Sequence, residues 1–434
     1  MLKQRRSGVI ILALLSLIGG LATGRDLFFN LTYLLGLLLI LSFGWAWSNI
    51  NWVHISRLTR TRRTQVGRPL EERFTVRNTS VIPKLWLELR DESTLPGHIA
   101  SNVTNNLGSR AARTWRASTL CRQRGRYRLG PVQLSTSDPF GLFPMSRALP
   151  ATTNVVVYPL TVDIHRFALP LGVLPGGDAL RRRTHYVTTN ASGVREYAPG
   201  DSISRIHWPS TARRDRLIVK EFELDPLADI WIVADMALTA HVANIPPERR
   251  SATSRDGMPH WLWWQNDRYK LPEATEEYTV SIAASLAQHF LRHDRAVGLL
   301  AYGQSHEIVQ PDRGERQLNR ILETLAVLRA QGQVPISDLV TSESSVFPRG
   351  TTVIVVTPVT SHDWLGAARQ LARQGLRVVN VLIDPQSFGG PESAAPLAEL
   401  LRASNQMTLL VRCDDDLSGV LSSSQVGPGY FALA

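Results

Sequence analysis

The chain has 434 residues, of which 44% are hydrophobic and 20% are charged, a composition typical of a globular protein with two or three domains. Its 48 Lys and Arg residues outnumber the 37 Asp and Glu residues, which leaves a net charge of +11. Such a basic excess fits nucleic acid, anionic lipid or an acidic partner without choosing among them. Cys121 and Cys413 lie far apart, which argues against a disulfide framework and a cysteine metal site and fits a reducing compartment.

Two apolar runs open the chain, at Gly8–Gly24 and Leu27–Trp47. Both are near the roughly 20 residues that a helix needs to cross a bilayer, and only Arg25 and Asp26 are charged between them. We therefore expect residues 1–54 to form two transmembrane helices in a tight hairpin. A signal peptide is the alternative for the first run, but the second run and the lack of a convincing cleavage site argue against it.

Basic residues flank both ends of this hairpin: Lys3, Arg5, Arg6, Arg57, Arg60, Arg62 and Arg63. The positive-inside rule therefore predicts that both ends, and everything after residue 55, lie in the cytoplasm. Trp45, Trp47 and Trp52 are expected at the headgroup level, where amphipathic rings are favoured. Membrane lipid is thus one expected partner, and it accounts for part of the basic excess.

Residues 55–165 have a period of two, which predicts β-strands. Leu85, Leu87 and Leu89 alternate with other side chains, as in a half-buried strand, and so do Phe74 and Val76. Short strands separated by turn signals predict a β-sandwich that is loosely immunoglobulin-like. Seven of its arginines lie between residues 110 and 128, and we interpret them as a solvated face near the membrane: Arg110, Arg113, Arg116, Arg122, Arg124, Arg126 and Arg128. No nucleic-acid partner is expected, because no recognised nucleic-acid motif accompanies these arginines.

The turn at Asp138–Phe143 contains two aromatic residues. Buried aromatic side chains usually belong to a core, so we expect this turn to pack the sandwich against the central segment of the chain. Direct contact with a ligand is the less favoured alternative.

Residues 226–434 alternate between strand and helix patterns, which predicts a doubly wound parallel sheet. The expected strands are 229–234, 296–302, 352–356, 377–383 and 407–411, with 306–309 as a short hairpin partner. The expected helices are 273–293, 316–330, 362–374 and 396–403. Ligands of such sheets bind beyond the carboxyl ends of the strands, where Asp235, Thr357 and Asp384 are expected.

This order of elements resembles a von Willebrand factor A domain. That fold implies a cation-binding Asp-x-Ser-x-Ser loop after its first strand, and the matching residues here are Asp235-Met236-Ala237-Leu238-Thr239. Asp235 and Thr239 keep the pattern, whereas Ala237 offers no ligand oxygen for a hard cation such as Mg²⁺. Asp235 alternatively caps the next element or pairs with an arginine, and we expect no cofactor.

The segment between Thr239 and Pro272 is an insertion that contains Trp261, Trp263 and Trp264. These tryptophans mark a partner-binding surface or, equally well, fold back as a small core of their own. The chain contains no GxxxxGK[ST], HExxH or GxSxG motif, and so gives no sign of nucleotide binding or hydrolysis by those means.

The central segment, residues 166–225, is dense in arginine and polar residues. One interpretation makes Ser202 a nucleophile with His207, although no nucleophile elbow surrounds them. A second makes Arg195, Arg205, Arg213 and Arg214 an anion site. The favoured interpretation is structural: the arginines and Asp201 form an ion-pair network at the junction of two domains, with Trp208 as an apolar plug.

The central segment also carries a long motif: Gly193, Arg195, Tyr197, Pro199, Gly200, Asp201, Arg205, His207, Trp208, Ala212, Arg213, Lys220, Glu221 and Phe222. With the earlier segments Gly125–Pro131 and Ser137–Phe143, it resembles the bacterial family known as domain of unknown function 58. The resemblance implies a membrane-bound partner of MoxR-type AAA+ ATPases, sometimes found with transglutaminase-like membrane proteins, in the assembly or maturation of other proteins. Pro209 departs from the family pattern, in which lysine is usual.

We therefore expect a membrane-anchored, non-enzymatic interaction protein at the bacterial inner membrane, with its domains on the cytoplasmic side. A MoxR-type AAA+ ATPase is its expected partner. The alternatives are a metal-dependent adhesion module that uses Asp235 and Thr239, and a membrane-associated hydrolase that uses Ser202 and His207.

Overall fold

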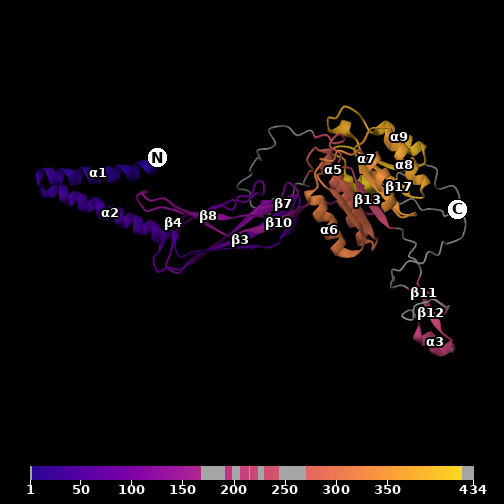
Figure 1. The fold of residues 1–434 in the computed structure, drawn as a ribbon, viewed down its shortest axis with the longest axis horizontal. Coiled ribbons are helices and arrows are strands. Elements are labelled where there is room, and N and C mark those ends of the chain that lie inside the picture. Colours follow the sequence, from indigo (N-terminus) through magenta and orange to yellow (C-terminus); the bar gives the residue numbers. More distant parts are fainter. Residues whose placement is uncertain are drawn as a thin grey trace. The chain divides into compact units, whose positions relative to one another are not determined.

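The computed structural model describes residues 2–167, 191–197, 206–214, 216–222, 229–243 and 270–422 (Figure 1). Gly200, Asp201, Ser202, Arg205 and the three tryptophans Trp261, Trp263 and Trp264 lie outside these residues. Contacts divide the chain into two compact units. The first spans Met1–Leu160 with Leu322–Leu328, and the second spans Thr161–Asn244, Glu273–Ile321 and Arg329–Ala434.

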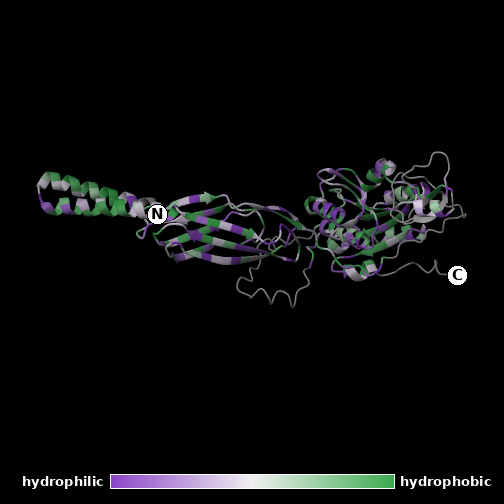
Figure 2. Ribbon diagram, turned by 90° about the horizontal axis from the view of Figure 1, so that it is seen from below, coloured by the Kyte–Doolittle hydropathy of each residue, from purple (hydrophilic) through white to green (hydrophobic). Residues whose placement is uncertain are grey.

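The first unit begins with two helices, α1 (Leu2–Thr23) and α2 (Asp26–Ile50), as the apolar runs predict. Both are long and apolar enough to cross a membrane, and most of their residues are exposed. Figure 2 shows the hydrophobic residues along this helix pair. The helices contact each other where the Ser16 hydroxyl donates to the Phe28 carbonyl at 2.8 Å, and where Gly19 and Gly20 leave room for the rings of Phe28 and Phe29.

Ten strands follow, which confirms the predicted strand-rich domain. They are β1 (Val53–Thr59), β2 (Arg63–Gln65), β3 (Pro69–Asn78), β4 (Lys84–Asp91), β5 (Asn102–Leu107), β6 (Ala112–Leu120), β7 (Gly125–Leu129), β8 (Val132–Thr136), β9 (Met145–Leu149) and β10 (Thr153–Tyr158). They form sheets with the orders β1-β3-β6, β5-β4-β8-β9 and β2-β10-β7. Phe74 and Val76 are buried as predicted, in a core shared by the first two sheets.

The predicted pattern of β4 is wrong at its first residues. Leu87 and Leu89 are buried, but Leu85 is exposed, and the buried residue at the start of the strand is Lys84. Its ammonium group donates to the Ser48 carbonyl in the last turn of α2 and lies 5.6 Å from the centre of the Trp52 ring. A cation is favourable at a helix C-terminus, where carbonyl groups have no partner within the helix, and this accounts for a buried lysine.

Four ionisable side chains meet inside the strand-rich domain, and each is at most 2% exposed. Arg57 donates to Glu72 at 2.7 Å and to Asp91 at 3.0 Å, while His98 Nε2 lies 2.9 Å from Asp91 and 3.1 Å from Glu72. Burial alone would raise the pKa of Glu72, but hydrogen bonds from Arg57 and His98 lower that pKa to about 2. Burial likewise opposes the charged form of His98, yet Asp91 and Glu72 raise its pKa. We call these four residues the buried quartet.

The turn at Asp138–Phe143 is built around its aspartate. The buried Asp138 carboxylate accepts hydrogen bonds from the backbone N–H groups of Phe140 at 3.0 Å and Phe143 at 2.7 Å. The Phe143 ring meets the Phe43 ring of α2 edge to face at 5.6 Å. The expectation that this turn packs against the central segment is therefore wrong for Phe143, whose ring contacts the apolar helix pair.

The second unit contains a six-stranded sheet with the order β15-β14-β13-β16-β17-β18. Strands β14, β13, β16, β17 and β18 are parallel, and β15 pairs antiparallel with β14. The strands are β13 (Ile230–Ala234), β14 (Val297–Tyr302), β15 (His306–Asp312), β16 (Thr352–Thr357), β17 (Arg377–Ile383) and β18 (Met407–Val411). The helices that accompany these strands along the chain are α5 (Thr275–Arg292), α6 (Gly314–Val327), α7 (Ile336–Ser342), α8 (Asp363–Arg373), α9 (Ala395–Ala403) and α10 (Leu417–Ser422). Residues 322–327 of α6 belong to the first unit. All of the predicted strands and helices are present, and α7 and α10 are additions.

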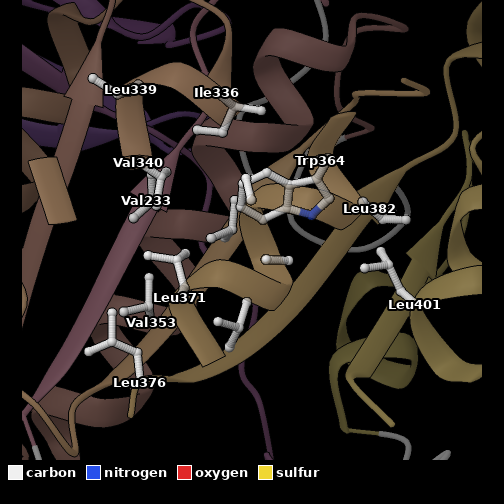
Figure 3. Close-up of a cluster of buried hydrophobic side chains, with 14 of the residues drawn as sticks. Val233, Ile336, Leu339, Val340, Val353, Trp364, Leu371, Leu376, Leu382 and Leu401 are labelled. Carbon is white, nitrogen blue, oxygen red and sulfur yellow. The ribbon is translucent and has the colours of Figure 1, made fainter. Parts of the chain in front are cut away.

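One face of the sheet is covered by α7, α8 and α9, which share a core with it (Figure 3). Trp231, Val233 and Val353 point into this core, as alternate residues of neighbouring strands do. The Trp364 indole of α8 is fully buried there, and its N–H donates to the Asn380 side chain at 2.9 Å. Helix α5 packs against β13, β14, β16 and β17.

Candidate functional site

Three polar residues lie at the carboxyl ends of neighbouring parallel strands, as the alternation of strands and helices predicts. Asp235 directly follows β13, Thr357 ends β16 and Asp384 directly follows β17. The strands are consecutive in the sheet, so their ends form one edge, which is where ligands of open α/β sheets bind. The geometry at this edge decides what these residues can do.

Asp235 is held by two hydrogen bonds inside the protein. The Thr357 hydroxyl donates to its Oδ2 at 2.6 Å, and the Ala237 backbone N–H donates to its Oδ1 at 3.0 Å. Burial raises the pKa of this carboxyl group, while the charge of His241 and the bond from Thr357 act in the opposite direction. The bond from Ala237 confirms that Asp235 caps the turn that follows its strand.

His241 and Thr275 complete this network, although no sequence motif indicated them. His241 Nε2 donates to the backbone carbonyl of Asp235 at 2.8 Å, and Nδ1 lies 3.0 Å from the Thr275 hydroxyl. The Val242 N–H donates to the same hydroxyl at 2.9 Å. Thr275 is the first residue of α5, so the loop after β13 is fastened to the start of that helix. A threonine at a helix start is the one local signal that sequence reasoning had available.

The loop after β13 is also fastened to Gly332. The Leu238 N–H donates to the Gly332 carbonyl at 2.8 Å, and the Gly332 N–H donates to the Met236 carbonyl at 2.9 Å. A Cβ atom on residue 332 would lie 2.2 Å from the Tyr302 carbonyl oxygen and 2.9 Å from that of Met236. Only glycine permits this close approach of three backbone segments.

The two predicted metal ligands lie in different surroundings. Asp235 is buried and hydrogen-bonded, whereas Thr239 is exposed and Ala237 has no side-chain oxygen. Within the part of the chain that the structure describes, no group of three or more His, Cys, Asp or Glu side chains is arranged to hold a metal ion. Mg²⁺ is bound by carboxylate oxygens and waters, and here both carboxylate oxygens of Asp235 already accept hydrogen bonds, from Thr357 and Ala237.

Asp384 has a structural role at the same edge. Its Oδ1 accepts the Ala394 backbone N–H at 3.0 Å, just before α9 begins, and its own carbonyl accepts the Ser387 hydroxyl at 2.7 Å. Arg412 lies 3.8 Å from its other oxygen. The structure thus joins Asp235 to Thr357, while the Asp384 carboxylate serves the turn before α9.

The central motif contributes a short hairpin and a helix. Strands β11 (Ala191–Glu196) and β12 (Ile218–Phe222) pair antiparallel, with Gly193 opposite Glu221 and Arg195 opposite Val219. Helix α3 (Trp208–Arg214) precedes β12. Strand β12 pairs with β11, and its Val219 also forms an antiparallel bridge with Ile206.

His207 ties α3 to β12. Its backbone N–H donates to the Ile218 carbonyl at 2.8 Å, and the Thr211 hydroxyl accepts the Ile218 N–H at 3.1 Å. The His207 ring reaches Ser210, with Nδ1 and Oγ 2.7 Å apart. Because these two residues are three apart at a helix start, this is a local capping contact. Among the described residues, the His207 ring therefore contacts Ser210. Ser202, its predicted partner in catalysis, lies outside the described residues.

Other motif side chains are directed to the surface. Trp208 is 62% exposed, Tyr197 is 36% exposed and Arg213 is exposed. The prediction that Trp208 is a buried plug finds no support among the described residues. Glu196 pairs with Arg216, which the motif did not single out.

Comparison with known proteins identifies the central motif. Residues 193–252 match the family model "Protein of unknown function DUF58". The predicted resemblance is confirmed. The uncharacterized protein YeaD of Bacillus subtilis is 23% identical over 249 residues, which cover 56% of this chain and 53% of that protein. The match therefore spans about half the length of this relative.

Solved structures show only weak similarity to the chain. The proximal thread matrix protein 1 of the mussel byssus is 14% identical, with a TM-score of 0.29, and the match covers 45% of this chain and 46% of that one. The CARDB domain of the PF1109 protein of Pyrococcus furiosus is 15% identical, with a TM-score of 0.19, and the match covers 24% of this chain and 86% of that one. Both scores are too low to support a conclusion on fold or function.

Proposed function

We propose that the chain is a membrane-anchored, non-enzymatic interaction protein that docks a MoxR-type AAA+ ATPase in the assembly or maturation of other proteins. The exposure of Trp208 within the family motif carries this proposal. Tryptophan, tyrosine and arginine are the residue types that most often dominate binding energy at protein interfaces. Trp208, Tyr197 and Arg213 supply all three within one short segment.

Membrane anchoring rests on α1 and α2. Both helices are apolar and long enough to cross a bilayer, and they expose most of their surface. Arg5 and Arg6 precede the first apolar run, and further arginines follow the second from Arg57 onward. By the positive-inside rule, the remaining domains lie on the cytoplasmic side of the bacterial inner membrane.

The two folded units supply the docking scaffold. We interpret the strand-rich domain as an immunoglobulin-like sandwich and the α/β domain as a doubly wound, von Willebrand factor A-like domain. The central parallel strands and the antiparallel edge strand β15 support the second interpretation. In place of a complete metal loop, this domain has the hydrogen-bonded network of Asp235 and Thr357. A transglutaminase-like membrane protein is a further candidate partner, and nucleic acid is not.

A binding experiment with a purified MoxR-type ATPase of the same organism tests the proposal. The detergent-solubilised chain is immobilised, and retention of the ATPase is compared with and without ATP. We expect nucleotide-dependent retention that Trp208→Ala weakens at least tenfold, on the order of 1.4 kcal/mol or more for a hot-spot residue. Trp86→Ala, at a 37% exposed tryptophan in β4, is the matched control and should bind normally. No retention of the ATPase in either nucleotide state would refute the proposal.

The alternatives give different results in related assays. A metal-dependent adhesion module would bind its partner only with Mg²⁺ and would lose that binding in Asp235→Ala. A hydrolase would lose activity in Ser202→Ala, a substitution that should leave ATPase binding unchanged.

A further inference from the structure

Exposed apolar side chains surround one end of the sandwich. Trp52 is 47% exposed, Val81 71%, Ile82 43% and Phe140 58%. They come from three separate loops: the residue pair after α2, the β3–β4 loop and the turn after β8. We call these four residues the apolar rim. Single exposed apolar residues are ordinary, but a group contributed by several loops at one end of a domain marks an interaction surface.

The loops of the apolar rim are fastened to the end of α2. The Thr79 N–H and hydroxyl donate to the Trp52 carbonyl at 2.8 and 2.7 Å, which holds the β3–β4 loop beside α2. The turn that carries Phe140 meets α2 through the contact of Phe143 with Phe43. Trp52 itself packs edge to face on Trp47 at 5.2 Å. The rim therefore has a defined position along the helix.

The length of α2 places this position at the edge of a bilayer. The sandwich reaches α2 at Phe43, which leaves 17 residues from Asp26 to Ser42 outside that contact. At 1.5 Å per residue they rise about 26 Å, whereas the hydrocarbon core is about 30 Å thick. Any tilt of the helix shortens this span further. If α2 crosses the membrane, the loops beside its last turns must therefore enter the boundary of the hydrocarbon core.

The charges at this end of the sandwich suit anionic headgroups. Arg77 at the end of β3 and Arg110 in the turn before β6 are exposed, and the Arg110 N–H donates to the Ser80 carbonyl in the rim loop at 3.1 Å. Arg6 of α1 lies 5.9 Å from the Phe143 ring centre. The acidic residue in the rim turns, Asp138, is buried and bonded to its own turn. Exposed arginines beside exposed aromatic and aliphatic side chains are typical of a surface that binds anionic lipid.

We propose that the apolar rim and its flanking arginines form a lipid-binding surface that inserts into the headgroup layer of an anionic bilayer. This inference rests on the proposed membrane anchoring and adds the lipid class and the residues that contact it. The sandwich is then held at the membrane by its own surface as well as by the helices. Its orientation above the bilayer is consequently restricted, rather than left to the short segment between α2 and β1.

Fluorescence quenching in nanodiscs tests this proposal. A bimane label is attached at Val81→Cys or, as a control, at Leu58→Cys, an equally apolar site that is 65% exposed on β1 of the same sandwich. Cys413 is replaced by serine, and Cys121 stays because it is buried and burial raises its pKa to about 12. The discs contain phosphatidylglycerol, or phosphatidylcholine alone, with a fraction of spin-labelled lipid as the quencher.

We expect strong quenching at residue 81 and little at residue 58 in phosphatidylglycerol discs. Arg77→Gln and Arg110→Gln should each weaken the binding of the apolar rim to the bilayer about fivefold, from the ~1 kcal/mol that one arginine gains near an anionic surface. Equal quenching at both sites in anchored protein would overturn the inference and leave the anchor intact. Quenching that is unchanged in phosphatidylcholine discs would show that the rim does not require anionic lipid. A cross-link between two Val81→Cys chains would show that the rim binds a second copy of the chain instead of lipid. Failure of the protein to enter discs would instead refute the membrane anchor.

Discussion

The buried quartet has balanced charges only while His98 is protonated. Arg57 and His98 then offset Glu72 and Asp91, and every carboxylate accepts hydrogen bonds from both cations. Such a group is costly to bury, and it is tolerated because its members satisfy one another. Removing one member leaves an uncompensated charge, so single substitutions here should be severe.

Glu72→Gln should lower the free energy of unfolding by about 3–5 kcal/mol, because it leaves Arg57 and His98 facing only Asp91. Glu71→Gln is the matched control: Glu71 pairs with Arg60 at 2.9 Å, but that pair is exposed and should contribute about 1 kcal/mol or less. Urea unfolding, followed by hydrogen exchange of the β3 and β6 amides, measures both variants. Equal effects of the two substitutions would contradict a buried network.

The same network predicts how stability depends on pH. His98 binds its proton more tightly in the folded state because Asp91 and Glu72 raise its pKa above the ordinary 6.5. The contribution of His98 to the free energy of unfolding is therefore complete below about pH 6.5. It is lost as the pH rises through the pKa that His98 has in the folded protein. The pKa of Glu72 falls from 4.5 to about 2, so its contribution is present above pH 4.5 and is lost as the pH falls through about 2. Urea midpoints measured across pH should show both slopes.

His98→Gln separates the two effects. It should abolish the loss of stability on the alkaline side, since the titrating proton is gone, while the acid side keeps the slope due to Glu72 and Asp91. An unchanged alkaline slope in this variant would show that another group is responsible.

At the scale of elements, the edge of the α/β sheet is fixed mainly by backbone contacts. The loop after β13 pairs with Gly332 and is fastened to the start of α5 through Thr275. These contacts hold Asp235 in place from both sides, whereas a metal loop would need its oxygens directed to one open point. The close approach at Gly332 makes this arrangement testable.

Gly332→Ala should destabilise the α/β domain by roughly 1–3 kcal/mol, because the new methyl group overlaps the Tyr302 carbonyl. Gly366→Ala in α8 is the control, since nothing lies within 4 Å of its Cβ position and alanine favours a helix by ~1 kcal/mol over glycine. Thermal unfolding of the two variants should thus shift in opposite directions. A neutral Gly332→Ala would mean that the loop relaxes without cost.

At the scale of the whole molecule, the proposed topology places both units on one side of the membrane. Green fluorescent protein fused after Ala434 should fluoresce, and alkaline phosphatase at the same place should be inactive. A phosphatase fusion after Gly24, between α1 and α2, should show the opposite result. An active phosphatase at the C-terminus would overturn the cytoplasmic assignment.

Much of the fold follows from local patterns. The length of the apolar runs predicts α1 and α2. A period of two predicts the strands of the first domain, and the alternation of strand and helix patterns predicts the elements of the second. The central motif predicts the resemblance to domain of unknown function 58 from contiguous residues, and residues 193–252 match that family model. The position of Asp235, Thr357 and Asp384 at one sheet edge also follows from the order of strands, because parallel strands end on the same side.

Local patterns fail where the burial or packing of a side chain depends on a partner that is distant in the sequence. Leu85 fits the alternation of β4, yet Lys84 is buried because α2 ends beside it. Phe143 packs on Phe43, one hundred residues earlier in the chain.

The amino-acid sequence by itself thus determined the apolar helix pair, the strand-rich and α/β domains and the family motif, since each depends on residues close in the chain. Only the tertiary structure decided which polar groups meet. Asp235 and Thr357 are 122 residues apart, and the members of the buried quartet come from separate segments. Burial makes each such group depend on its partners, and the register of strands, rather than any local pattern, brings those partners together.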